Sequence, residues 1–184
     1  MTNWNDDVKS VLVSETEAQE ICERLAKEID EDYKDSENLV LVGILKGSIT
    51  FMADLMRKIT HPAQVDFMRV SSYGDSTTSS GNVNIILDLN RKNLPNEDIL
   101  IVEDIVDSGR TLKYLVGYLL NKGAKSVRTV TLLDKPERRE VDFSPEYIGK
   151  QIENSFVIGY GLDYDEKFRA LPYVGVLKPE VYLK

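Results

Sequence analysis

Cysteine, histidine and long apolar segments are nearly missing from this chain of 184 residues. A single cysteine, Cys22, excludes an internal disulfide, and with one histidine, His61, the chain offers no Ser-His-Asp triad, Cys-His pair or zinc site. We interpret Cys22 as a small core residue and His61, which precedes Pro62, as a surface residue. No apolar run approaches the length of a membrane span, and the first residues lack a secretory signal. These absences predict a soluble, cytoplasmic protein that binds no membrane.

Positive charge is also scarce. The chain has 23 lysines and arginines against 31 acids, a net charge of −8, and its pI is near 4.8. Proteins that bind nucleic acid non-specifically need a basic face that displaces counterions, so we expect no nucleic-acid partner. The length and the hydrophobic content of 42% suit one domain over residues 1–184.

Apolar strand-like runs alternate with helical patterns along the chain, which predicts an α/β fold with a parallel sheet flanked by helices. We expect helices from Ser14, where Glu17 would complete a capping box, from 49 to 59 and after Gly109. The expected strands span 7–13, 39–45, 64–73, 83–87, 99–102, 126–133, 156–161 and 173–177. The N-terminal and C-terminal segments would form a small hood over the sheet's carboxyl edge.

The stretch from 96 to 121, NEDILIVEDIVDSGRTLKYLVGYLLN, is predicted to be a strand, an acidic loop and a helix. The loop combines a helix start with hydroxyls and a glycine, which together favour binding of a phosphate group. Its residues are Asp107, Ser108, Gly109, Arg110 and Thr111.

Two acids, Glu103 and Asp104, follow the apolar run 99–102, where we expect the strand to end. Paired carboxylates can accept hydrogen bonds from a sugar diol or hold a hydrated Mg²⁺. A ligand with both a phosphate and a sugar diol would fit the whole stretch. The alternative is that Asp107 only caps the helix and that the two acids are ordinary loop residues.

A second strand-to-helix junction carries Lys46, Gly47 and Ser48 after the apolar run 39–45. A cation and free amides at a helix start form another anion site, although the segment is too short for a Walker A loop. The alternative is a tight turn with a solvated lysine.

The run VEDIVDSGRTL resembles the phosphoribosyl-diphosphate (PRPP) motif of type I phosphoribosyltransferases. Together with LKGS, SSYG, the Lys135 segment and GYGLDYDEKFR, it is most similar to the hypoxanthine-guanine phosphoribosyltransferases. This resemblance covers residues 11–181. It implies Mg²⁺-dependent transfer of the 5-phosphoribosyl group from PRPP to N9 of hypoxanthine and guanine, giving IMP or GMP in purine salvage.

The resemblance also implies roles for individual residues. Asp107 would be the general base, and Lys46, Gly47 and Arg169 would bind diphosphate, with a non-proline cis peptide before Lys46. PRPP would contact Glu103, Asp104 and the loop 107–111. The purine would meet Lys135, Phe156, Val157 and Asp163, and the metal would meet Glu103, Asp104 and Asp163. Composition alone would favour Lys135 as a surface lysine, and aromatic residues in strands, such as Phe156, are usually core residues.

A polar stretch with two glycines lies between the expected strands 64–73 and 83–87. It could be an ordinary hairpin loop. The resemblance implies instead a flexible lid, about 72–84 and including Ser72 and Tyr73, that closes over the site.

Three other functions remain open. A regulator on the same fold could bind PRPP and control RNA or DNA, but the acidic charge disfavours it. A related transferase could prefer xanthine, and a receiver-like signalling module would explain the acids but neither LKGS nor Lys135. The expected partners are small molecules and further copies of the chain, as a homodimer or homotetramer.

Overall fold

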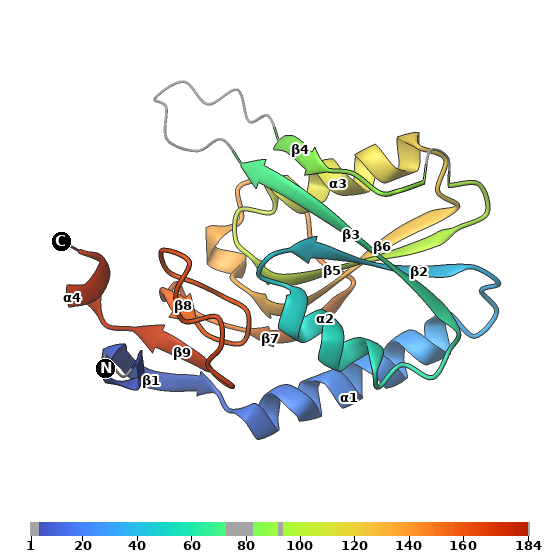
Figure 1. The fold of residues 1–184 in the computed structure, drawn as a ribbon. Coiled ribbons are helices and arrows are strands. Elements are labelled where there is room, and N and C mark those ends of the chain that lie inside the picture. Colours follow the sequence, from blue (N-terminus) through green and yellow to red (C-terminus); the bar gives the residue numbers. More distant parts are fainter. Residues whose placement is uncertain (1–3, 73–82, 92–93, 184) are drawn as a thin grey trace.

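The computed structural model describes residues 4–72, 83–91 and 94–183, which form two β-sheets and the helices around them (Figure 1). The larger sheet has the strand order β4-β3-β2-β5-β6-β7, and the smaller has the order β1-β9-β8. The strands are β1 (Val8–Val13), β2 (Leu39–Leu45), β3 (Ala63–Ser72), β4 (Val83–Leu87), β5 (Asp98–Val106), β6 (Ser126–Asp134), β7 (Tyr147–Gln151), β8 (Val157–Ile158) and β9 (Val174–Leu177). The α-helices are α1 (Glu15–Asp32), α2 (Ile49–Met56), α3 (Arg110–Asn121) and α4 (Pro179–Tyr182), with 3₁₀ turns η1 (Trp4–Asp7) and η2 (Pro136–Arg138).

The larger sheet confirms the predicted parallel α/β architecture. Strand β2 pairs in parallel with both β3 and β5, and β6 pairs in parallel with both β5 and β7. Among the described strands of this sheet, only the edge strand β4 runs antiparallel, beside β3. Because the central strands run the same way, their carboxyl ends meet at one edge, where ligands bind in open α/β sheets.

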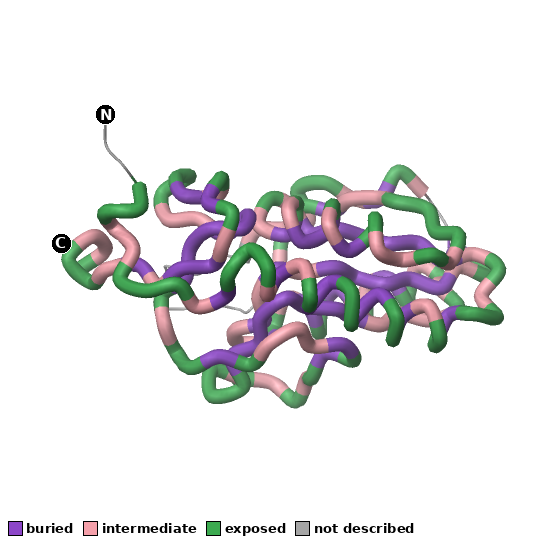
Figure 2. The backbone as a smooth tube through the Cα atoms, turned by 90° about the horizontal axis from the view of Figure 1, so that it is seen from below, coloured by how far each residue is buried: buried purple, intermediate pink, exposed green. Residues whose placement is uncertain are grey.

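The central strands are buried on both faces, as their continuous apolar runs predict (Figure 2). In β2, Leu39 and Leu41 face the core beneath α1 and α2, whereas Val40 and Val42 face the core beneath α3. The result is a three-layer arrangement of helices, sheet and helix (Figure 1). No helix within the described ranges is long and apolar enough to cross a membrane.

The small sheet joins the two ends of the chain. Strand β1 from the N-terminal part pairs with β9 from the C-terminal part, which in turn pairs with β8. These are the segments from which we predict a hood, while the assignment of 1–184 to one domain stays a prediction.

Several expected elements differ in extent. Strand β7 was not expected, β8 has two residues instead of the expected 156–161, and α2 ends at Met56 instead of at 59. Ser14 caps α1 by accepting a hydrogen bond from the Glu17 amide (3.1 Å), but the Glu17 carboxylate accepts one from Lys150 instead of completing a capping box. His61 is half-buried, with Nε2 3.0 Å from the Ser36 carbonyl, and Cys22 is fully buried as predicted.

Asp98 anchors the amino-terminal end of β5. Its carboxylate accepts hydrogen bonds from Ser126 (2.7 Å), Ser36 (2.7 Å) and Lys125 (3.2 Å). Burial by itself would raise the pKa of Asp98, but these donors outweigh it and hold the pKa below its ordinary value. Because the folded-state pKa is depressed, the stabilisation is present above the unfolded-state pKa of about 4 and is lost as pH falls through the folded-state pKa.

We therefore expect Asp98→Asn to lower the free energy of unfolding at pH 7 by about 1–3 kcal/mol, the scale of charge-assisted hydrogen bonds. Urea unfolding of both proteins at pH 7 and pH 3 should give a smaller difference at the acidic pH. Asp35→Asn, at an exposed position, is the control and should change little. An equal difference at both pH values would contradict the proposed role of the charge.

Candidate active site

Strand β5 carries the two predicted acids within its hydrogen-bonded length instead of after its end. It continues to Val106, and Glu103 pairs with Thr131 of β6, so the predicted strand end at 102 is wrong. Asp104 is buried, and its carboxylate accepts a hydrogen bond from the Ile105 amide (2.8 Å). Burial raises the pKa of both carboxyls, and the charge of Asp104 raises the pKa of Glu103 further.

The loop after β5 presents the start of α3. Gly109, with φ of 80°, is the N-cap, and no side chain caps the helix, so capping by Asp107 is not observed. Ser108 Oγ lies 3.4 Å from the Arg110 amide, and Thr111 belongs to the first turn. Apart from this weak contact to the Arg110 amide, no side chain within the described residues caps the first turn, so a helix start of this kind can accept an anion.

The segment after β6 fixes this loop from the other side. Arg139 donates to the Asp107 carbonyl (2.5 Å) and to the buried carboxylate of Asp134. The Glu140 amide donates to the Ser108 carbonyl (3.0 Å), and the Glu140 carboxylate pairs with Arg110 (2.6 Å). The sequence indicates no role for Arg139 or Glu140, because their run of charges, KPERRE, is also typical of solvated surface.

The LKGS turn lies directly against Asp104 of β5. The peptide bond between Leu45 and Lys46 is cis, as the resemblance implies. A Cβ on Gly47 would lie 1.7 Å from Oδ2 of Asp104, and a Cβ on Gly161 would lie 2.1 Å from the Gly47 carbonyl oxygen. Only residues without a side chain allow these three segments to pack so closely.

The loop after β8 brings further charges to the same place. Arg169 pairs with Asp163 (2.8 Å) and Glu166 (3.3 Å), and it donates to the Gly161 carbonyl (2.8 Å). Lys46 pairs with the same Glu166 carboxylate (2.8 Å). The predicted diphosphate-binding cations, Lys46 and Arg169, therefore lie together, with an acid between them.

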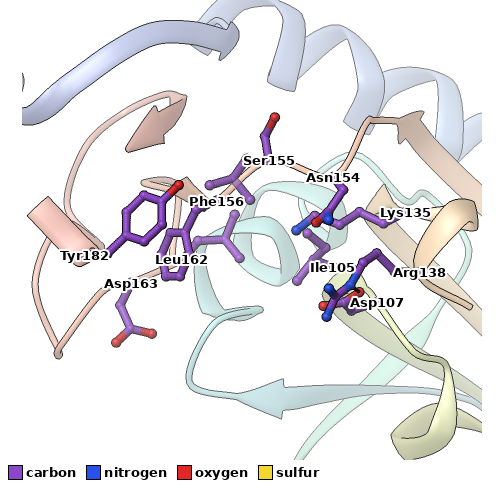
Figure 3. Close-up of a pocket in the computed structure, with 11 residues that line it drawn as sticks. Ile105, Asp107, Lys135, Arg138, Asn154, Ser155, Phe156, Leu162, Asp163 and Tyr182 are labelled. Atoms are coloured by element: carbon purple, nitrogen blue, oxygen red, sulfur yellow. Dashed lines mark hydrogen bonds and ion pairs between the residues drawn. The ribbon is translucent and has the colours of Figure 1, made fainter. Parts of the chain in front are cut away.

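A cleft of about 420 Å³ opens beside the loop (Figure 3). It contains five of the predicted residues: Asp107, Lys135, Phe156, Val157 and Asp163. Lys135 is 8% exposed and burial lowers its pKa, so the interpretation as a free surface lysine is wrong, whereas Phe156 is 38% exposed and is not a core residue. Nζ of Lys135 makes no hydrogen bond or ion pair to another residue that the structure describes.

The cleft is also lined by residues that are not among those predicted from the sequence: Ile105, Arg138, Asn154, Ser155, Leu162 and Tyr182. Ile105 could have been inferred from its place between the acids and the loop. Arg138 is hidden in the same charged run as Arg139, and its Nε lies 2.8 Å from Oδ1 of Asp107. Nothing in the sequence indicates Asn154, Ser155 or Tyr182.

Two predictions, the set of metal ligands and the lid, stay predictions. Within the described ranges, no group of three or more acids, histidines or cysteines is placed to hold a metal, so Asp163 does not join Glu103 and Asp104 in one set. Asp163 pairs with Arg169 instead. Of the predicted lid, Ser72 ends β3 and Val83 begins β4, while Tyr73 and residues 74–82 lie outside the described residues.

Comparison with known proteins agrees with this geometry. The family model of the phosphoribosyl transferase domain matches residues 12–165. The hypoxanthine-guanine phosphoribosyltransferase of Staphylococcus epidermidis is 51% identical over 97% of this chain and 98% of its own length. The chain is 49% identical to the bifunctional protein TilS/HprT of Listeria monocytogenes but spans 28% of that protein's length.

A solved hypoxanthine phosphoribosyltransferase from Staphylococcus aureus superimposes with a TM-score of 0.92 at 49% identity, covering 97% of this chain and 96% of that one. The similarity in sequence and in structure thus extends over nearly the whole chain. The chain belongs to the hypoxanthine-guanine phosphoribosyltransferases, within the phosphoribosyl transferase domain family.

Proposed function

We propose that the protein transfers the 5-phosphoribosyl group of PRPP to N9 of hypoxanthine and guanine, giving IMP or GMP and diphosphate in purine salvage. One observation carries this proposal. Asp107 belongs both to the phosphate loop and to the cleft that holds Lys135 and Phe156, so a sugar phosphate and a planar base would meet at this carboxylate. The activities for which the relatives are named support the same conclusion.

The reaction breaks the bond between C1 of the ribose and a diphosphate oxygen, and the lone pair of N9 forms the new bond to C1. The purine then loses a proton from N7, which Asp107 accepts as general base. Arg138 already donates to Oδ1 of Asp107, so we assign the proton transfer to Oδ2. Positioning of N9 towards C1 itself lowers the barrier.

Recognition of the base follows from the walls of the cleft. The Lys135 ammonium is buried without a hydrogen-bond partner in the described chain, and a carbonyl oxygen at C6 of a purine would supply one. Phe156 would stack on the purine ring, and the backbone of Val157 and Asp163 would face its edge. Ile105, the last residue but one of β5, also lines the cleft.

Cations of the loop after β8 and of the LKGS turn would stabilise the leaving diphosphate. Lys46 and Arg169 would bind its oxygens, and the amides of the loop 107–111 would hold the 5-phosphate. Glu103 and Asp104 would hold the ribose hydroxyls and Mg²⁺.

The donor set fits Mg²⁺, which needs only one or two protein carboxylates beside water and phosphate oxygens. Burial raises the pKa of both carboxyls, and a divalent cation would offset that cost. When bound, Mg²⁺ neutralises charge that develops on the diphosphate. Asp163 would act on the metal through water. Use of Mg²⁺, the oligomeric state and the cellular location stay predictions.

The direct test incubates the protein with PRPP, with and without Mg²⁺, and with hypoxanthine, guanine, xanthine or uracil in turn. We expect nucleotide formation with hypoxanthine and guanine. Turnover of xanthine alone would favour the xanthine-preferring relative. RNA binding in a gel-shift assay without any turnover would favour the regulator.

Glu166 offers a separate prediction about the diphosphate site. Its carboxylate lies between Lys46 and Arg169, where the diphosphate would bind, and these hydrogen bonds lower its pKa, so it is ionised. An incoming diphosphate must displace this anion. We expect Glu166→Gln to lower KM for PRPP by about twofold to fivefold, the scale of one exposed ion pair.

Steady-state kinetics at varied PRPP concentration measure this effect. Asp165→Asn is the matched control, because it removes the same charge from the same loop but from a pair with Lys167. Its KM should remain near that of the wild type. A higher KM in Glu166→Gln would show that Glu166 assists PRPP binding instead of competing with it.

A further inference from the structure

Tyr182, at the end of α4, has no place in the reaction described so far, yet it lies in the cleft. Its ring stacks on Phe156, with the ring centroids 4.8 Å apart and the planes 21° from parallel. Tyr164 meets the same phenylalanine edge to face, with centroids 5.6 Å apart. Phe156 is therefore enclosed by two aromatic neighbours, although 38% of it is exposed.

The arrangement in Figure 3 separates the two sides of this ring. Phe156 lies between Tyr182 on one side and Lys135 with Ile105 on the other. All four residues contribute to the cleft. A purine would stack on the side of Phe156 that faces Lys135. Tyr182 contacts the Phe156 ring from the opposite side.

Helix α4 is held in place by contacts between the two ends of the chain. The Lys178 amide donates to the Asp7 carbonyl (3.0 Å), and its ammonium donates to the Asp6 carbonyl (2.6 Å). Tyr182 also packs against the small core formed by Ile158, Phe168, Leu171 and Leu177. These contacts restrict where the Tyr182 ring can lie, so it can act as a fixed support.

We propose that Tyr182 is a positioning residue of the purine site, which holds the Phe156 ring in the plane needed for stacking on the base. The proposal rests on the proposed function. Without the tyrosine ring, Phe156 gains rotational freedom and must lose it again when the purine binds. The cost should fall on binding of the base and not on binding of PRPP, because Phe156 and Tyr182 line the cleft for the base, whereas residues 46–48 and 108–111 do not line it.

The test compares full-length wild-type protein with Tyr182→Ala, Tyr182→Leu and Tyr182→Phe. For Tyr182→Ala we expect KM for hypoxanthine to rise by about threefold to tenfold, the scale of one aromatic pair, with kcat and KM for PRPP nearly unchanged. Tyr182→Phe should restore the wild-type KM, since the ring and not the hydroxyl is used. Leu183→Ala, at the adjacent and 72% exposed residue, is the control.

An unchanged KM for hypoxanthine in Tyr182→Ala, or an equal rise in KM for PRPP, would overturn the proposal. A lower KM would also overturn it, by showing that Tyr182 obstructs the cleft. If the alanine variant does not fold, KM for hypoxanthine is compared between Tyr182→Leu and the wild type instead, because leucine keeps an apolar contact with Phe156 but has no aromatic face. The wild-type protein tests the proposed function separately from the role of Tyr182. If the wild type forms no nucleotide, the proposed function is refuted, whatever the variants do.

Discussion

The Asp107→Asn variant should have a kcat at least about 100-fold below that of the wild type, while KM for PRPP stays within about threefold. Asparagine keeps the shape of the side chain but cannot accept the proton from N7. The backbone of the loop should persist, because Arg139 binds the Asp107 carbonyl and not its side chain. PRPP binding depends on that backbone, so kcat and KM should separate.

Steady-state kinetics with hypoxanthine and PRPP measure both constants. Asp142→Asn provides a control in a neighbouring segment, since Asp142 is exposed and lies outside the cleft. It should behave as the wild type. Wild-type turnover in Asp107→Asn would refute the assignment of the general base. If activity falls because KM for PRPP rises, and not because kcat falls, Asp107 would be assigned to substrate binding instead.

The second large effect is expected for Gly47→Ala. The added Cβ would lie 1.7 Å from Oδ2 and 2.7 Å from Cγ of Asp104, so either the turn or the carboxylate must move. Misplacement of a site by about 1 Å can lower activity about 100-fold, and we expect kcat/KM to fall by at least that factor. Overpacking should also lower the free energy of unfolding by about 1–3 kcal/mol.

Gly117→Ala is the matched control for this variant. Gly117 lies inside α3, and a Cβ there meets nothing within 4 Å. The control should keep full activity and gain about 0.5–1 kcal/mol in the free energy of unfolding, because alanine has the higher helix propensity. Kinetics and urea unfolding measure both properties. If Gly47→Ala keeps the wild-type kcat/KM, the close contact with Asp104 is not required for catalysis.

Pairing with a neighbouring strand, and not the local sequence, decides the length of β5. The apolar run predicts where the strand begins, but the acids that follow it do not end it. Strand β5 continues because its backbone pairs with β6 as far as Val106 and Asp134. Such pairing depends on a partner strand, and polarity along one segment does not report it. Strand β7 was missed for a related reason, because its short segment around Gly149 gains strand geometry from β6.

The residues with the strongest predicted roles share a local signal. Asp107, Lys46 and Lys135 each follow a strand, where a parallel sheet gathers its ligand-binding groups. Arg138, Arg139 and Glu140 carry no such signal, since a run of charges is equally typical of solvated surface. Their contacts with the loop 107–110 arise only when β6 lies beside β5.

The sequence by itself determined the alternation of buried strands and helices, the loop at the start of α3 and the cation before Gly47, because each depends on residues adjacent in the chain. Only the tertiary structure decided that Gly47 packs against Asp104, that Glu166 lies between two cations and that Tyr182 supports Phe156. These contacts join segments far apart in sequence. Their geometry is fixed by packing of the whole fold, which no local pattern encodes.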